Sequence, residues 1–133
     1  MRSRILVIGA GGIGSLLGEQ IARAFAFSGL SQQKFLELTF MDGDRIEVRN
    51  LAHQQFGHAD ISQPKVSIVQ DRILANGIAS LSGVEVNGIA EDFSAQTDLS
   101  KYDLVIVSVD REEPRHLVHT NATQWLDLRA RGD

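Results

Sequence analysis

The chain has 133 residues, of which 43% are hydrophobic and 23% charged, which suits a single globular domain spanning residues 1–133. The formal net charge of −4 and the scattered basic residues argue against nucleic acid or an anionic membrane as a partner. The sequence contains no cysteine, so disulfides, thiolate nucleophiles and cysteine-bound zinc are excluded and no zinc is expected.

The chain opens with a predicted strand, a glycine loop and a helix. The apolar run Arg4–Gly9 is typical of a buried parallel strand, and it is too short for a signal peptide or a membrane span, so we expect a cytoplasmic protein. The loop "GAGGIGS" follows it. Apolar residues then recur at helical spacing, at Ile13, Leu16, Leu17, Ile21, Ala24 and Phe25.

Strands and helices continue to alternate along the rest of the chain. The patterns predict strands at Phe35–Asp42, Val84–Ala90, Tyr102–Val109 and from Trp125, with helices at Gln63–Asn76 and Glu112–His119. This alternation indicates an α/β protein, a Rossmann-like three-layer sandwich with a mainly parallel sheet in the strand order 3-2-1-4-5.

The glycine loop favours nucleotide binding over a purely structural turn. Gly9 suits a tight turn, Gly11 lets backbone N–H groups approach a phosphate, and Gly14 lets the helix pack close to the sheet. Asp42 could hold ribose hydroxyls, although it lies later than the usual 20 or so positions after such a loop. The loop alone leaves two classes open, a dinucleotide-binding oxidoreductase and an ATP-binding adenylating enzyme.

Three further segments narrow this choice: "MDGDRIEVRNLAHQQF", "ISQPKVSIVQDRI" and "DLVIVSVDREEPR". With the doubled glycine of "GAGGIGS", their order and register resemble the ThiF/MoeB/HesA family of ubiquitin-activating-enzyme-like adenylyltransferases. That family reads GxGGxGS, then D-x-D-x-[VI]-x-x-S-N-L-x-R-Q, then G-x-P-K, then D-L-V-x-D-x-x-D-N-x-x-x-R. The resemblance extends from Ile5 to about Arg115.

The resemblance implies a set of ATP-binding positions. They are Gly9, Gly11, Gly12, Gly14, Asp42, Asp44, Asn50, Gln54 and Lys65. The glycines match the loop over the phosphates, and Asp42 matches the ribose-binding carboxylate. Asp44 matches the second acid of that turn, while Asn50 matches a polar residue near the phosphates and Gln54 the glutamine of the R-Q pair.

The resemblance also implies catalytic roles for Lys65, as the lysine that contacts phosphate, and for Asp110, as the metal residue that helps to position Mg²⁺. Arg115 matches the arginine of the following helix. Adenylation requires the charge of pyrophosphate to be neutralised, and these residue types suit that task. Because Asp42 and Asp110 end parallel strands at one edge, we expect them to meet at a common crevice.

Each of these residues also has a structural interpretation. Asp42 and Asp44 could be turn formers, Lys65 an exposed first-turn lysine, and Asp110 a helix cap. Arg115, judged alone, suits a surface or ion-pair residue. The histidine pair formed by His116 and His119 could share a helix face, although it lacks the spacing of a known metal motif.

The sequence departs from the family pattern at several positions. His53 stands where the pattern has the R-Q arginine, and it lacks the bidentate fork and permanent charge of that arginine. Arg49 replaces the serine before Asn50, and Arg111 replaces the asparagine after Asp110. Either arginine could supply the lost charge. Transfer through a thioester is excluded, because the chain has no cysteine.

The resemblance predicts an ATP-binding domain that uses Mg²⁺ to activate the C-terminal carboxylate of a ubiquitin-like or sulfur-carrier protein. We expect the chain to be the N-terminal part of a longer adenylation domain and to form a homodimer or heterodimer. Two alternatives remain: a catalytically degenerate scaffold or dimerisation partner of the same family, and an NAD(P)-binding oxidoreductase domain.

Overall fold

The computed structural model describes residues 2–27, 34–47, 57–75, 83–109 and 111–128. Five strands of this part form one sheet in the order β3-β2-β1-β4-β5, and every neighbouring pair is parallel. The strands are β1 (Arg2–Ile8), β2 (Phe35–Met41), β3 (Val84–Ile89), β4 (Leu104–Val107) and β5 (Trp125–Asp127). The predicted Rossmann-like α/β fold and its strand order are therefore confirmed.

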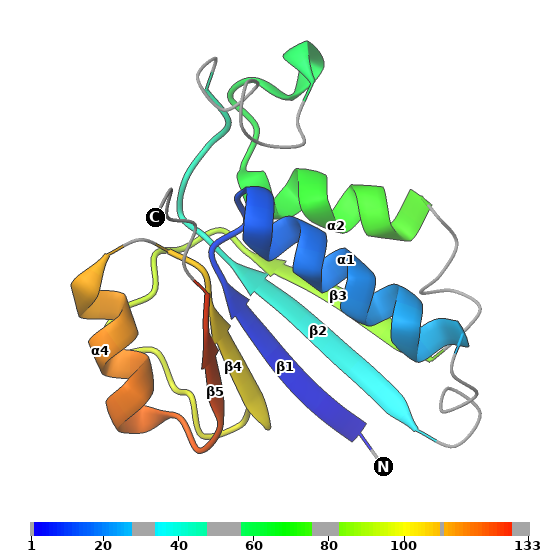
Figure 1. Ribbon diagram of the computed structural model, residues 1–133. Helices are drawn as coiled ribbons and strands as arrows, with labels where there is room; N and C mark the ends of the chain where they lie inside the picture. Colours follow the sequence, from blue (N-terminus) through cyan, green and yellow to red (C-terminus); the bar gives the residue numbers. More distant parts are fainter. Residues whose placement is uncertain (1, 28–33, 48–56, 76–82, 110, 129–133) are drawn as a thin grey trace.

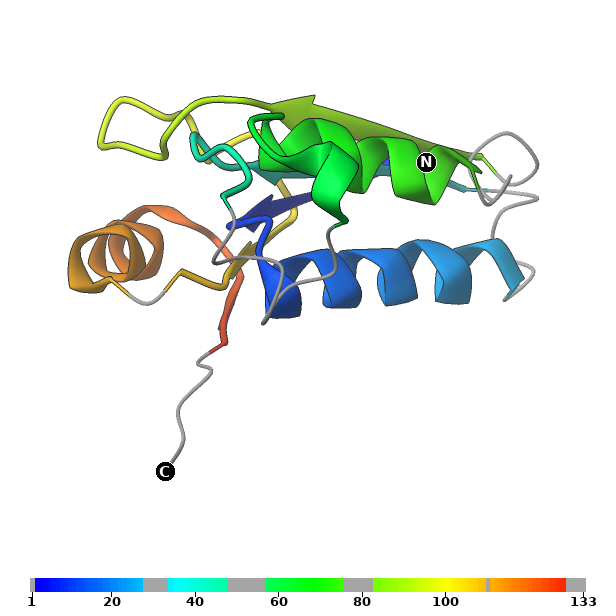
Figure 2. The same ribbon diagram turned by 90° about the horizontal axis from the view of Figure 1, so that it is seen from above.

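Helices cover the two faces of this sheet (Figure 1). Among the described residues they are α1 (Gly12–Phe27), α2 (Lys65–Ala75) and α4 (Glu112–Asn121), and one turn of 3₁₀ helix spans His58–Asp60. Seen from above, α1 and α2 lie on one side of the sheet and α4 lies on the other (Figure 2). None of the described helices has the length and apolar character needed to cross a membrane.

Each face of the sheet carries its own core because side chains alternate along a strand. In β1, Val7 packs with the residues beneath α1 and α2, whereas Leu6 and Ile8 pack on the α4 side. Phe40 and Ile106 extend the first core. The continuous apolar run of β1 is thus explained by a central strand that is buried on both faces.

Some boundaries differ from the prediction by one or two residues. α2 begins at Lys65 rather than Gln63, because the Gln63 carbonyl still accepts a hydrogen bond from the Ile46 N–H at 2.9 Å. β4 begins at Leu104 rather than Tyr102, because the Tyr102 N–H bonds to the Leu99 carbonyl in a turn. The first of these ends is decided by a partner distant in the sequence and the second by a local turn, and periodicity alone reveals neither.

Candidate functional site

The glycine loop joins β1 to α1 through a turn that suits only glycine. Gly9 has a φ of +101°, a region that other residues rarely adopt. A Cβ on Gly9 would lie 2.7 Å from Ser108 Oγ and 3.0 Å from Val109 Cγ1, and one on Gly14 would overlap the Gly9 carbonyl oxygen. The start of α1 at Gly12 is therefore packed closely against the ends of β1 and β4.

Ser108 holds this turn from the neighbouring strand. Its hydroxyl donates to the carbonyl oxygens of Ile8 at 3.0 Å and Gly9 at 3.2 Å, and its backbone N–H also donates to Ile8 at 2.9 Å. Ser108 is not among the residues predicted to form the site. Its position could have been inferred from the sequence, because Ser108 directly follows the apolar strand β4. That strand runs beside β1, with Val107 in register with Ile8.

Asp42 links the end of β2 to the glycine loop. Its Oδ2 accepts a hydrogen bond from the Ala10 N–H at 2.8 Å, and its Oδ1 accepts one from the Asp44 N–H at 2.8 Å. The second bond is the turn-forming role considered for this "DGD" segment. The first is a contact across 32 residues of sequence that orders the loop, so Asp42 is more than a local turn former.

Lys65 is buried at the start of α2. Only 7% of the residue is exposed, so the interpretation as an exposed first-turn lysine is wrong. Its Nζ lies 3.9 Å from Asp44 Oδ2, and its backbone N–H donates to the Asp44 carbonyl at 3.1 Å. A bridge between Arg45 and Pro64 joins the same two segments. The turn after β2 thus fixes where α2 begins and where its lysine lies.

These segments surround a hollow of about 250 Å³ at the carboxyl end of the sheet. It is lined by Gly9, Gly11, Asp42, Asp44, Lys65, Ser108, Val109 and Arg111. Five predicted site residues therefore meet in one place, and Gly12 and Gly14 belong to the same loop. A larger hollow of about 390 Å³ near Arg2 and Glu85 lies away from the glycine loop. We place the site at the carboxyl edge, where open parallel sheets bind ligands.

Three predicted site residues lie outside the described residues: Asn50, Gln54 and Asp110. The same holds for His53, the residue that departs from the family pattern. Their expected roles stay predictions. Arg111, which directly follows Asp110, is described and lines the hollow. It is one of the two arginines considered as a source of the charge that His53 lacks.

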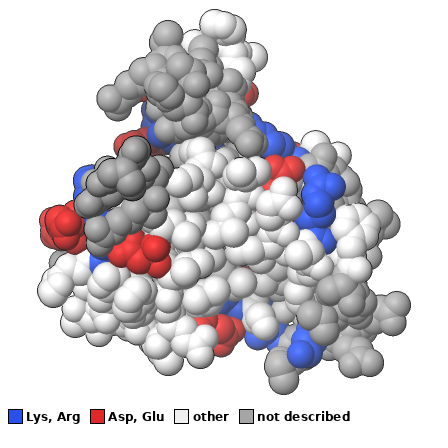
Figure 3. Space-filling view, in the orientation of Figure 1, with Lys and Arg blue, Asp and Glu red and all other residues white. Residues whose placement is uncertain are grey.

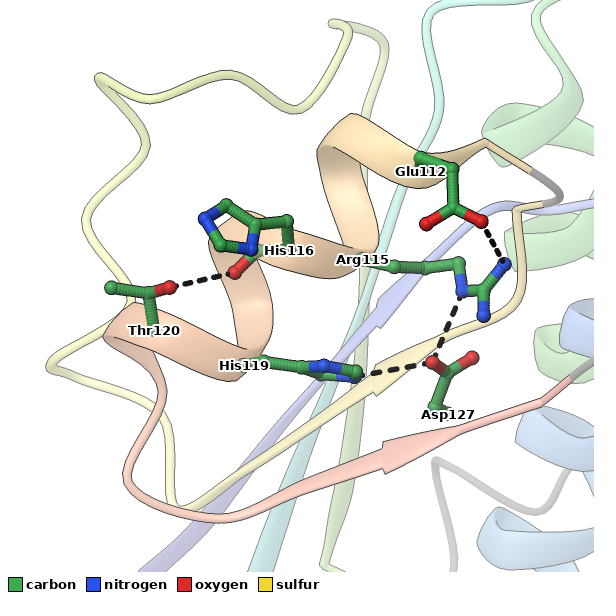
Figure 4. Close-up of polar contacts among 6 residues, drawn as sticks. All are labelled: Glu112, Arg115, His116, His119, Thr120 and Asp127. Carbon is green, nitrogen blue, oxygen red and sulfur yellow. Dashed lines mark hydrogen bonds and ion pairs between the residues drawn. The ribbon is translucent and has the colours of Figure 1, made fainter.

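Arg115 is a buried residue of α4 whose side chain points toward Asp127 of β5 (Figure 4), and it does not line this hollow. Its Nε lies 3.1 Å from Asp127 Oδ2, and its Nη1 lies 3.8 Å from Glu112 Oε1. Because 3% of the Arg115 side chain and 12% of the Asp127 side chain are exposed, the pair is largely desolvated. Of the two interpretations considered for Arg115, the ion pair is right and the surface position is wrong.

The two histidines of α4 do not share a common contact in the structure. His119 Nε2 lies 3.1 Å from Asp127 Oδ2 and its ring stacks on Trp125, whereas the His116 carbonyl accepts a bond from the Thr120 hydroxyl (Figure 4). Within the part of the chain that the structure describes, no group of three histidine, aspartate or glutamate side chains is arranged to hold a metal ion.

Sequence comparison identifies the class of protein that this fold and site belong to. The model of the ThiF family matches residues 1–125, so the chain belongs to the ThiF family. It is 32% identical over 130 residues to the NEDD8-activating enzyme E1 catalytic subunit of Arabidopsis thaliana, covering 93% of this chain and 25% of that one. It is 28% identical over 116 residues to the molybdopterin-synthase adenylyltransferase of Escherichia coli, covering 86% and 42% respectively.

Solved structures share the same fold. The tRNA N6-threonylcarbamoyladenosine dehydratase TcdA of E. coli, in complex with ATP, matches 94% of this chain and 50% of that one, with a TM-score of 0.73 and 21% identity. E. coli MccB crystallised with ATP matches 82% and 30%, with a TM-score of 0.62 and 26% identity. The chain thus spans between about a quarter and a half of the length of these relatives.

Proposed function

We propose that this chain is the nucleotide-binding part of an adenylyltransferase that uses ATP to activate the C-terminal carboxylate of a ubiquitin-like or sulfur-carrier protein. One observation carries the proposal: the glycine loop, Asp42 and the buried Lys65 meet in one hollow of a ThiF-family fold. Relatives named as a NEDD8-activating enzyme and a molybdopterin-synthase adenylyltransferase support it.

In this proposal the nucleotide lies across the carboxyl end of β1. Backbone N–H groups of the glycine loop and the first turn of α1 bind a phosphate, because the first N–H groups of a helix have no acceptor within it. Asp42 accepts bonds from the ribose hydroxyls. Its two oxygens already accept backbone N–H groups, but each has a further lone pair for a hydroxyl.

The proposed reaction is an in-line displacement at the α-phosphorus. A carboxylate oxygen of the carrier forms a bond to this phosphorus, and the bond to the bridging oxygen of pyrophosphate breaks, which leaves an acyl adenylate and pyrophosphate. Lys65 contributes positive charge where the leaving group becomes more negative. Its burial strengthens this effect, since a charge acts over a longer range when water is excluded.

Mg²⁺ suits the residues of this site. It is usually held by one or two carboxylates together with substrate phosphates, and carboxylate oxygens of Asp42 and Asp44 border the hollow. In the proposal Asp110 is the protein ligand. When bound, Mg²⁺ would neutralise part of the phosphate charge.

We also propose that the protein works as a homodimer or heterodimer. The face over α1 carries few charged residues, which gather instead around its rim (Figure 3). On α1 itself, Ile13 and Leu16 are 38% and 43% exposed. Apolar side chains exposed together favour association with another protein surface.

The test of the proposed function is a calorimetric titration of the chain with ATP and Mg²⁺, alongside a titration with NAD. Micromolar binding of ATP without binding of NAD is the expected result. Binding of NAD alone would favour the oxidoreductase alternative. Absence of binding to both ligands would favour the non-enzymatic scaffold.

A further inference from the structure

Arg111 is a cation at the hollow with no partner among the described residues. It directly precedes α4 in an extended conformation, and its side chain makes no capping hydrogen bond to that helix. It lines the hollow and is exposed to solvent. Lys65, in contrast, already lies 3.9 Å from the carboxylate of Asp44. The hollow therefore contains a guanidinium that no carboxylate of the described residues contacts.

The strand order separates this cation from the acidic side of the hollow. β1 lies between β2 and β4, so Asp42, which follows β2, and Arg111, which precedes α4 after β4, lie on opposite sides of the glycine loop. Asp44 lies on the Asp42 side. Carboxylates accept bonds from hydroxyl groups and repel phosphates, whereas a guanidinium attracts phosphates. The hollow thus has carboxylates on the β2 side of the glycine loop and a guanidinium on the β4 side.

We propose that Arg111 binds the terminal phosphates of the nucleotide from the β4 side of the glycine loop, while Lys65 contacts the polyphosphate from the side of α2. A ligand with sugar hydroxyls at one end and a polyphosphate at the other fits this polarity. The guanidinium can form two parallel hydrogen bonds to a phosphate, which an asparagine at this position would not provide. This inference rests on the proposed function of ATP binding.

The charges on the neighbouring turn of α4 do not cancel this effect. Glu112 lies 3.8 Å from Arg115 Nη1, and 87% of its side chain is exposed, so Arg115 and water both screen its charge. Glu113 is exposed on the first turn, where water screens it. The first-turn N–H groups of α4 add positive potential next to Arg111.

The test compares the affinities of ATP and AMP, each with Mg²⁺, for the chain and three variants by calorimetry. Arg111→Ala removes the guanidinium. Arg111→Lys keeps the positive charge but cannot form two parallel hydrogen bonds to one phosphate. Arg23→Ala is the matched control, because Arg23 is an exposed arginine of α1 whose guanidinium lies 3.5 Å from Glu19 and which does not line the hollow.

We expect Arg111→Ala to weaken ATP binding about tenfold or more, as the loss of charge-assisted hydrogen bonds implies, while AMP affinity stays within about twofold. Arg111→Lys should lose less, and Arg23→Ala should leave both affinities unchanged. An unchanged affinity of Arg111→Ala for ATP, or an equal loss for AMP and ATP, would overturn this inference alone. If the unaltered chain binds neither nucleotide, the proposed function fails with it.

Discussion

The Asp42 carboxylate accepts a hydrogen bond from the Ala10 N–H at 2.8 Å, and this contact ties the end of β2 to the glycine loop. The same carboxylate orders its own turn through the Asp44 N–H. One side chain therefore positions both walls of the proposed nucleotide site before any ligand binds. Such pre-organisation lowers the conformational entropy that binding has to overcome.

Substitution of Asp42 by alanine should affect both stability and binding. Loss of two charge-assisted bonds at a half-buried position should lower the free energy of unfolding by about 1–3 kcal/mol. ATP affinity should fall as well, because the loop loses its anchor. Urea denaturation and calorimetry measure the two effects. Asp71→Ala, at an exposed position of α2, is the matched control and should change neither. Unchanged stability of Asp42→Ala would contradict the anchoring role.

Substitution of Lys65 by methionine should separate binding from stability. Methionine keeps an unbranched apolar side chain in the buried space, and the carboxylate left behind on Asp44 is 64% exposed, so little stability should be lost. ATP affinity should fall about tenfold or more, because a buried cation next to phosphate is removed.

Lys101→Met is the control for this substitution, because Lys101 lies over the Tyr102 ring and does not line the hollow at the glycine loop. The prediction would be contradicted if Lys65→Met bound ATP as tightly as the unaltered chain and were equally stable. Lys65 would then not contact phosphate.

Alanine at Gly9 should destabilise the fold through two separate effects. The positive φ is strained for any side chain, and the new Cβ would crowd Ser108 Oγ. We expect a loss of about 1–3 kcal/mol in urea denaturation. The double variant Gly9→Ala/Ser108→Ala should recover only part of it, since removal of the hydroxyl relieves the contact and leaves the φ strain.

Gly57→Ala provides the comparison for this substitution. A Cβ at Gly57 would meet only Asp60 Oδ2, at an ordinary 3.8 Å, so the stability should change little. A loss at Gly57 as large as the loss at Gly9 would show that the cost is not specific to the loop.

The ion pair between Arg115 and Asp127 should matter far more than the exposed pairs of the sheet. Removing the guanidinium in Arg115→Ala leaves a carboxylate with 12% of its side chain exposed, which should cost about 3–5 kcal/mol. Arg2→Ala breaks an exposed pair with Glu37, in which 51% of the Arg2 side chain is accessible, and should cost less than about 1 kcal/mol. Urea denaturation of both variants tests the contrast, and equal losses would disprove it.

Much of the fold could be predicted from local patterns. The apolar run before the glycine loop, the helical spacing after it and the alternation of strands and helices led to the correct fold class and strand order. These patterns are local because a strand buried on both faces needs continuous apolar residues, and right-handed parallel connections leave few possible orders. The doubled glycine and the "QPK" segment led in the same way to the ThiF family.

Other features were decided only by the tertiary structure. The burial of Lys65 against Asp44, the bond between Asp42 and Ala10, and the hydroxyl of Ser108 on the glycine turn each join segments far apart in the sequence. No periodic pattern encodes such contacts, because they depend on how the strand ends meet at one edge of the sheet. The sequence by itself determined which residue types are available to bind a nucleotide, and folding decided which of them share the hollow.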